Sequence, residues 1–219
     1  MFDDIKQEAT EKLIKVKLYL SGIDSGNSRL ALVSAEFQTS LKGLFFVYLY
    51  GIFEMTVIKT IRRTIDELNS ADVRISECKR ELLSLILSPE YDALHGVGEN
   101  KKWPRRWDIS RKLIDNEKLD IVENLIPTDG RNIKKDQLES IYKSFGNSNP
   151  VFPRPEIQGY LDELVRYRNY IAHGDMLPQE IGRNYTVADL EKRRGSIDEL
   201  CTYIIDSYES YIVNQEYLV

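Results

Sequence analysis

Apolar residues recur every three or four positions along most of the chain, and this spacing predicts helices that bury one face. The first pattern covers residues 2–20, and its apolar positions are Ile5, Ala9, Leu13, Val16 and Leu20. Residues 21–27 contain two glycines, two serines and an asparagine, which predict a loop. A second helical pattern runs from Ser28 through Leu68, with a predicted break near residues 39–40.

The middle of the chain is less regular. Residues 70–87 predict a helix that Pro89 stops, and its apolar positions are Val73, Ile75, Leu82, Leu83 and Ile86. Residues 91–108, with Gly96 and Gly98, predict an irregular segment. A short helix over 109–119, a linker over 120–131 and a helix over 134–145 are expected next. Residues 88–150 are therefore predicted to form an inserted arm with short helices.

The last third of the chain predicts two helices. Pro153 and Pro155 open the first, because proline is tolerated in a first turn, and it ends at His173. Residues 177–185 predict a loop, and Thr186 with Asp189 forms a capping box for the last helix. With no convincing strand and no internal repeat, the pattern predicts an all-α fold, in which residues 1–219 form one helical domain.

The end of the first of these helices, residues 161–174, contains the main candidate site. Gly174 and then Pro178 follow His173, and this order is the usual sign of a helix end. The His173 imidazole is therefore expected on the final turn. Asn169 lies four residues earlier on the same face. Arg168 is about 140° away round the axis, but the length of its side chain lets it flank the same cleft as the imidazole.

These residue types suit phosphodiester chemistry without a metal. Histidine transfers protons near neutral pH, and the helix dipole favours its charged form at this end. Arginine binds phosphate through two parallel donors. The spacing of Arg168 and His173 is weak evidence alone. In the structural alternative, Arg168 pairs with Asp162 or Glu163 while His173 only caps its helix.

The longer string Arg-Asn-Tyr-Ile-Ala-His-Gly at 168–174 resembles the signature of the HEPN superfamily, whose ribonucleases carry an Arg-[Asn/Asp/His]-x3-His motif at the end of a long helix. The resemblance covers about residues 40–215. Phe53-Glu54 and the segment Thr128–Ile133 are similar to the RiboL-PSP-HEPN (MAE-type) branch. The resemblance implies a HEPN-like helical bundle, catalytic roles for Arg168, Asn169 and His173, and a homodimer whose two motifs form one RNA-cutting cleft.

The resemblance also has a local exception. Some HEPN toxins carry a tyrosine two residues after the histidine, and a partner nucleotidyltransferase modifies it. The corresponding residue here is Asp175, so we do not expect that form of regulation.

Glu54 is the one carboxylate within the most apolar run, residues 44–58. The aromatic residues of this run are predicted to pack in the core, and they are Phe45, Phe46, Tyr48, Tyr50 and Phe53. Burying an unpaired carboxylate costs several kcal/mol. Glu54 therefore either meets Arg168 or other polar groups of the motif in a supporting role, or lies on a solvent-facing stripe beside Lys59.

A second candidate site is basic and aromatic. Residues 101–112 contain six cations against one anion, with two tryptophans between them. Cations bind phosphates, and aromatic rings stack on unpaired bases. The predicted RNA-binding residues are Lys101, Lys102, Trp103, Arg105, Arg106 and Trp107. In the alternative, the tryptophans anchor the arm to the bundle and the cations are merely solvated.

Composition limits the remaining classes. The net charge of −5 counts mildly against RNA as a partner, although local charge decides contacts. Cys78 and Cys201 form no Cys-x-x-Cys motif, so we expect no zinc site, no other metal and no cofactor. Buried thiols suit a reducing cytoplasm. The N-terminus lacks a signal-peptide pattern, and residues 44–58 are shorter than the ~20 residues of a membrane span.

Three functions follow from these observations. The first is a metal-independent endoribonuclease that leaves a 2′,3′-cyclic phosphate, acting as a toxin or antiviral defence effector with a cognate antitoxin or another regulator. The second is a non-catalytic module that binds RNA or protein. The third is a structural dimerisation adaptor that uses the aromatic helix as its interface.

Overall fold

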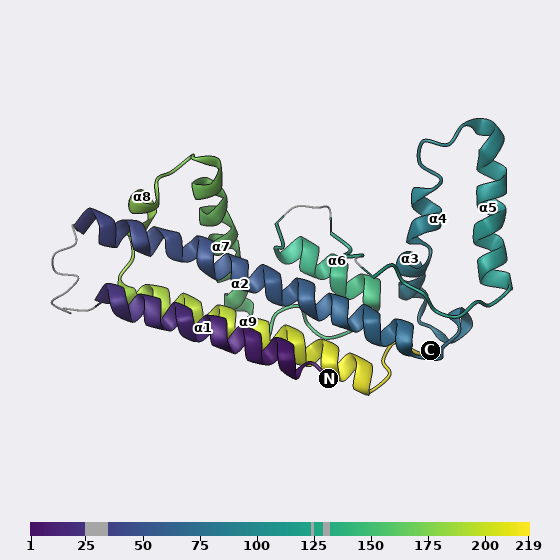
Figure 1. The fold of residues 1–219 in the computed structure, drawn as a ribbon, viewed down its shortest axis with the longest axis horizontal. Coiled ribbons are helices and arrows are strands. Elements are labelled where there is room, and N and C mark those ends of the chain that lie inside the picture. Colours follow the sequence, from purple (N-terminus) through teal and green to yellow (C-terminus); the bar gives the residue numbers. More distant parts are fainter. Residues whose placement is uncertain (25–34, 124, 129–131) are drawn as a thin grey trace.

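The computed structural model describes residues 1–24, 35–123, 125–128 and 132–219. Within these ranges the secondary structure is helical, with two isolated β-bridges and no strand, so the all-α prediction is confirmed. Three long helices lie side by side along the molecule (Figure 1): α1 (Asp3–Asp24), α2 (Ala35–Ser70) and α9 (Val187–Val213). A fourth helix, α7 (Pro155–His173), packs against α2 and α9. The apolar faces of these helices meet in one hydrophobic core.

Helix α2 is the centre of this core. It continues through residues 39–40, so the predicted break there is wrong: the Thr39 and Ser40 hydroxyls donate to helix carbonyls at 2.9 Å instead of interrupting them. Thr56, Thr60 and Thr64 are fully buried, and each donates to the carbonyl four residues earlier. The helix backbone thus satisfies all three buried hydroxyls.

The aromatic residues of the apolar run 44–58 are buried except for one. Phe45, Phe46, Tyr50 and Phe53 lie in the core, whereas Tyr48 is 40% exposed, so its predicted core position is wrong. The helix is long and apolar enough to cross a membrane by length and composition alone. In this structure, however, 56% of its most apolar window is buried, as expected for the central helix of a bundle.

Helix α8 (Pro178–Gly182) replaces the loop that was predicted over 177–185. It lies directly on α2, because a Cβ at Gly43 would be 2.0 Å from the Pro178 carbonyl oxygen. A Cβ at Gly182 would be 1.9 Å from the Thr39 carbonyl oxygen. These two glycines allow the backbones to touch, and the contact fixes the chain just beyond the end of α7.

Residues 70–87 do not form the predicted helix. They form two 3-10 turns, η1 (Ile75–Glu77) and η2 (Arg80–Leu82), and a short helix α3 (Leu83–Ile86). Their backbone N–H groups bond to distant segments instead: Ile75 donates to the Glu117 carbonyl at 3.0 Å, and Lys79 to the Tyr217 carbonyl at 2.8 Å. Contrary to the prediction, Pro89 does not end a helix but lies in the first turn of α4 (Ser88–Asp92).

A second correction concerns residues 91–108, most of which belong to a regular helix, α5 (Glu99–Ile114). Pro104 lies in its second turn, where the missing N–H removes one intrahelical hydrogen bond. Helices α4 and α5 stand beside each other and project from the bundle as an arm (Figure 1). Helix α6 (Lys135–Phe145) instead packs into the core and ends at Gly146, whose φ is 63°.

Candidate functional site

The residues singled out at 161–174 form the last turns of α7, as the helix-end signals predict. Gly174 caps the helix in a left-handed conformation with φ 77°. Its N–H bonds to the Ile171 carbonyl at 3.2 Å, and the Asp175 N–H bonds to the Tyr170 carbonyl at 2.9 Å. His173 is therefore the final helical residue, and its side chain is exposed. An exposed imidazole at a helix C-terminus is accessible to a ligand.

A polar cluster centred on Glu163 fixes the middle of α7 to α9. Glu163 pairs with Arg193, which also donates a 3.1 Å hydrogen bond to it, and it accepts a 2.7 Å bond from the Tyr185 hydroxyl. Glu163 is thus engaged by α9, so the alternative in which it pairs with Arg168 is not observed. Within the described residues, Arg168 forms no ion pair with Asp162 either.

Arg168 is half-buried and makes two contacts near its guanidinium. Nη1 donates to the Asn169 Oδ1 at 3.1 Å, and the guanidinium carbon lies 5.3 Å from the centroid of the Tyr50 ring. Asn169 Oδ1 also accepts a 2.6 Å hydrogen bond from the Asn132 side-chain amide. Arg168 and Asn169 are thus connected both to α2 and to the segment before α6.

Glu54 reaches this group through Tyr50. Its Oε1 accepts a 2.9 Å hydrogen bond from the Tyr50 hydroxyl, which itself accepts one from the Ile133 N–H at 2.9 Å. Burial, with the negative charge of Glu54 beside it, raises the pKa of the Tyr50 phenol well above its usual value. The phenol therefore stays protonated, and its O–H donates the hydrogen bond to Glu54. Lys59 pairs instead with Glu8 on α1.

Tyr50 and Asn132 are the two site residues that sequence reasoning missed. Tyr50 could have been found because it lies four residues before Glu54 on one helix face. Asn132 belongs to the segment 128–133 that was singled out by its resemblance. Residues 129–131 of that segment lie outside the described residues, whereas Asn132 and Ile133 contact the motif group.

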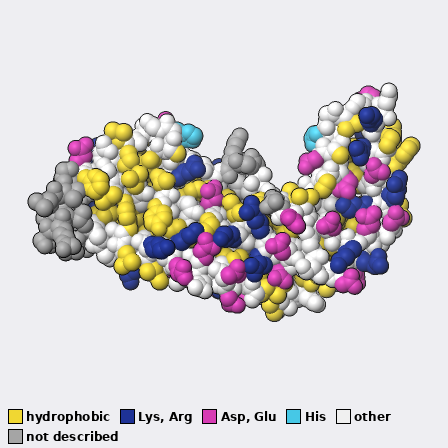
Figure 2. All heavy atoms as spheres, in the orientation of Figure 1, with side chains coloured by type: hydrophobic (Ala, Val, Ile, Leu, Met, Phe, Trp, Pro, Cys, Tyr) yellow, Lys and Arg dark blue, Asp and Glu magenta, His cyan; other side chains and the backbone are white. Residues whose placement is uncertain are grey.

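The six predicted RNA-binding residues all lie on α5, and the structure does not bring them together with the motif. Figure 1 places α5 on the far side of α4 from α7, and Figure 2 shows the molecule hollowed between the arm and the rest. The inner face of α5 is fixed by Lys112, which bonds to the Ile86 carbonyl at 3.1 Å and to Glu90 at 2.9 Å. The arm and the motif are therefore separate surfaces of one chain.

The two tryptophans of α5 face away from the bundle. Trp103 is nine residues before Lys112, or about 180° round the helix axis, and Trp107 is on the same side. Each is 60% exposed. They do not anchor the arm to the bundle, so that part of the alternative is wrong, whereas most cations of α5 are exposed to solvent, as its other part expects. The Arg106 guanidinium lies 4.9 Å from the Trp103 ring, which adds a cation to this outward face.

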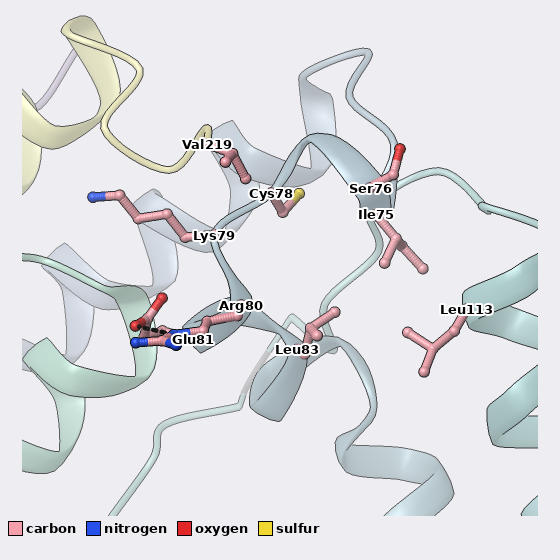
Figure 3. Close-up of a pocket in the computed structure, with 9 residues that line it drawn as sticks. All are labelled: Ile75, Ser76, Cys78, Lys79, Arg80, Glu81, Leu83, Leu113 and Val219. Carbon is pink, nitrogen blue, oxygen red and sulfur yellow. Dashed lines mark hydrogen bonds and ion pairs between the residues drawn. The ribbon is translucent and has the colours of Figure 1, made fainter.

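The cysteines and the cavity at the root of the arm offer less chemistry than the motif. Cys78 and Cys201 are free and buried, and burial raises the pKa of these thiols to about 11 and about 12, so they stay protonated. Among the described residues, no group of three or more His, Cys, Asp or Glu side chains could hold a metal ion. A cavity of about 480 Å³ at the root of the arm (Figure 3) is lined mainly by apolar groups, among them Ile75, Cys78, Leu83, Leu113 and Val219. It contains no motif residue.

Comparison with known proteins gives one positive finding. A family model described as HEPN_MAE_28990/-like HEPN matches residues 2–217, which is almost the whole chain. No curated protein and no solved structure matches.

Proposed function

The chain belongs to the MAE_28990-like HEPN family, and from that premise we propose that it is a metal-independent endoribonuclease. The observation that supports this most strongly is the end of α7. There an exposed imidazole, His173, follows within about one and a half turns of an arginine that is held from two sides. Arg168 gives one N–H to Asn169, so most of its five donors stay available for a phosphate.

The proposed reaction is internal attack by a ribose 2′-hydroxyl. An imidazole takes the 2′-hydroxyl proton, the O2′–P bond forms, the P–O5′ bond breaks, and a proton passes to the leaving O5′. The products are a 2′,3′-cyclic phosphate and a 5′-hydroxyl. Proton transfer by a positioned side chain typically contributes ~10²–10⁴ in rate. Arg168 stabilises the negative charge that develops on the phosphoryl oxygens.

This reaction uses a base and an acid, whereas each motif contains a single histidine. We therefore propose a homodimer in which two copies of the α7 end face each other across a two-fold axis. One imidazole then removes a proton and the other donates one. Asn169 orients its neighbouring groups, and Glu54 supports Arg168 through Tyr50.

The outward face of α5 is the proposed contact for single-stranded RNA beyond the cut site. It combines the exposed rings of Trp103 and Trp107 with Arg106, and Lys102 lies at its edge. Lys101 and Arg105 lie on the same side of α5 as Lys112, where Arg105 borders a cavity with Glu90, so their charge lies beside this face rather than on it. Base stacking on aromatic rings is tolerant of sequence, and cations follow the backbone. A toxin or defence role in the cytoplasm, with an antitoxin or another regulator as partner, is proposed from the family resemblance.

The test is to incubate purified protein with RNA in EDTA and to sequence the RNA ends. We expect continued cleavage that leaves 2′,3′-cyclic phosphate and 5′-hydroxyl ends. Cleavage that stops in EDTA, or that leaves 3′-hydroxyl ends, would contradict the metal-independent mechanism. Binding without any cleavage would instead support a non-catalytic RNA-binding module, which the exposed face of α5 also suits.

A further inference from the structure

Tyr50 connects three parts of the chain around the Arg168 guanidinium. Its ring lies 5.3 Å from the guanidinium carbon, on α7. Its hydroxyl donates to Glu54 on the next turn of α2 and accepts from the Ile133 N–H, 83 residues along the chain. The side chain is 1% exposed, so no part of it is free to move independently of these neighbours.

Each of these contacts restricts Tyr50 for a physical reason. The hydrogen bond from Ile133 is buried, and an unsatisfied buried N–H is unfavourable, so the phenol oxygen is held in place. Its proton points to Glu54, whose charge makes that bond stronger than a neutral one. The O–H bond of a phenol lies close to the plane of its ring, so the directions of these two hydrogen bonds also restrict the plane of the ring. A cation above a buried ring is attracted by its electron-rich face.

A second connection reaches the same guanidinium from the segment before α6. Asn132 donates to the Asn169 Oδ1 at 2.6 Å, and that oxygen also accepts from Arg168 Nη1 at 3.1 Å. Asn132 is the direct neighbour of Ile133, whose N–H is bonded to Tyr50. The ring and the amide therefore hold Arg168 from two sides, and residues 132–133 connect the two.

We propose that Tyr50 is a positioning residue for Arg168, with Asn132 as the second member of the same clamp; this rests on the proposed endoribonuclease function. Neither residue is expected to contact the reacting atoms. Both fix the direction of a guanidinium whose remaining donors meet the phosphoryl oxygens. A long arginine side chain would otherwise sample many rotamers, and small misplacements of a catalytic group are costly.

The first experiment is Tyr50→Phe, which keeps the ring and removes only the hydroxyl. We expect kcat to fall about tenfold with little change in KM, because a displacement of ~1 Å can cost 10²-fold and the ring remains. The matched control is Tyr208→Phe. Tyr208 is fully buried, and its hydroxyl has no hydrogen-bond partner among the described residues, so its loss should leave kcat unchanged. An unchanged kcat in Tyr50→Phe would overturn the proposal.

A coupling experiment separates positioning from a purely structural role. In an Arg168→Lys background, Tyr50→Phe should cause no further loss of kcat, since the group that it positions is absent. If the double variant instead shows the full loss of kcat from both single variants combined, Tyr50 acts elsewhere. If Tyr50→Phe does not fold, Asn132→Ala tests the same clamp, because it removes only a half-buried side chain. It should lower kcat about three- to tenfold, and an unchanged kcat would count against the clamp.

The last measurement does not depend on cleavage. The side-chain Nε–H signal of Arg168 in an NMR spectrum of ¹⁵N-labelled protein should be sharp in the wild type, and it should shift and broaden in Tyr50→Phe but not in Tyr208→Phe. If the wild type cuts no RNA while this pattern is seen, the proposed function fails and the positioning role stands. If RNA is cut while Tyr50→Phe leaves the signal unchanged, the positioning role fails alone.

Discussion

The end of α7 and the outward face of α5 both present arginine, yet they hold it in opposite ways. Arg168 is half-buried, bonded to Asn169 and placed against the Tyr50 ring by contacts that cross three elements. Apart from Lys112, which pairs with Glu90 on α4, the cations of α5 are mostly exposed, and their ion pairs are local, as between Arg105 and Asp108 at 3.8 Å or Arg111 and Asp108 at 3.6 Å. Exposed pairs of this kind contribute little to stability.

This difference separates two tasks. A guanidinium that meets a transition state must be in one place before the reaction starts. A surface that holds a flexible RNA strand benefits from side chains that adjust to its path, because affinity comes from charge and stacking. If the proposed function holds, changes at α7 should alter kcat, whereas changes at α5 should alter binding. Four predictions test that division.

The largest effect is expected from His173→Ala. Removing the imidazole should lower kcat by ~10²–10⁴, the usual contribution of general acid–base catalysis, without loss of helical content. The chain provides its own control, since His95 is the only other histidine and is also exposed. His95→Ala should cut normally. Equal activity of the two variants in an RNA cleavage assay would remove the motif from the mechanism.

The second effect is expected from Arg168→Lys. Lysine keeps the charge but lacks the planar fork and its delocalised face, so it cannot both bond to Asn169 and bind phosphate with two donors. We expect kcat to fall ~10²-fold, comparable to the loss of one donor to a developing oxyanion. Arg166→Lys, on the exposed side of the same helix, is the control and should stay within twofold of the wild type. A loss confined to KM would show that Arg168 acts in binding alone.

The same comparison shows what sequence alone could predict. The end of α7 was predicted to the residue because Gly174 and Pro178 mark it directly, and local signals of this kind need no tertiary information. The long helices α1, α2 and α9 followed from their periodic apolar faces. Local signals failed over 70–87, where long-range backbone hydrogen bonds replace those of a helix. They failed again at α5, where Pro104 is tolerated within a helix.

The candidate site divides in the same way. Arg168, Asn169 and His173 lie within six consecutive residues, so the sequence alone could identify them as one motif. The clamp could not, because it joins Tyr50 to a residue 83 positions away, and Asn132 to Asn169 across 37 positions. A single chain offers no local pattern for such contacts. The sequence pointed to Glu54 because of its unusual place in an apolar run, but its neighbour Tyr50 makes the contact with Arg168.

The third prediction concerns the tryptophans of α5. Replacing Trp103 and Trp107 with alanine should weaken single-stranded RNA binding by about 1–2 kcal/mol each, as the loss of a stacked base does. Binding should be measured in the His173→Ala background, so that the RNA stays intact. In the active protein the double variant should raise KM and leave kcat unchanged. A fall in kcat instead would show that the arm and the motif act as one site, which would break the comparison.

The smallest effect is expected from Arg106→Ala, and it appears in the salt dependence of binding. Each phosphate contact that is lost should reduce the slope of log K against log salt by ~0.7 on a single strand. The Arg106 guanidinium also lies over the Trp103 ring, so the substitution removes this cation–π contact. Because this side of α5 is exposed, we expect the helix to stay folded. Arg80→Ala is a matched control, because Arg80 is a highly exposed arginine outside the arm. If both variants reduce the slope equally, the charge of α5 contributes nothing specific and the tryptophans alone define that surface. If only Arg106→Ala does, the outward face of α5 binds RNA through charge and stacking together, independently of the clamped arginine of α7.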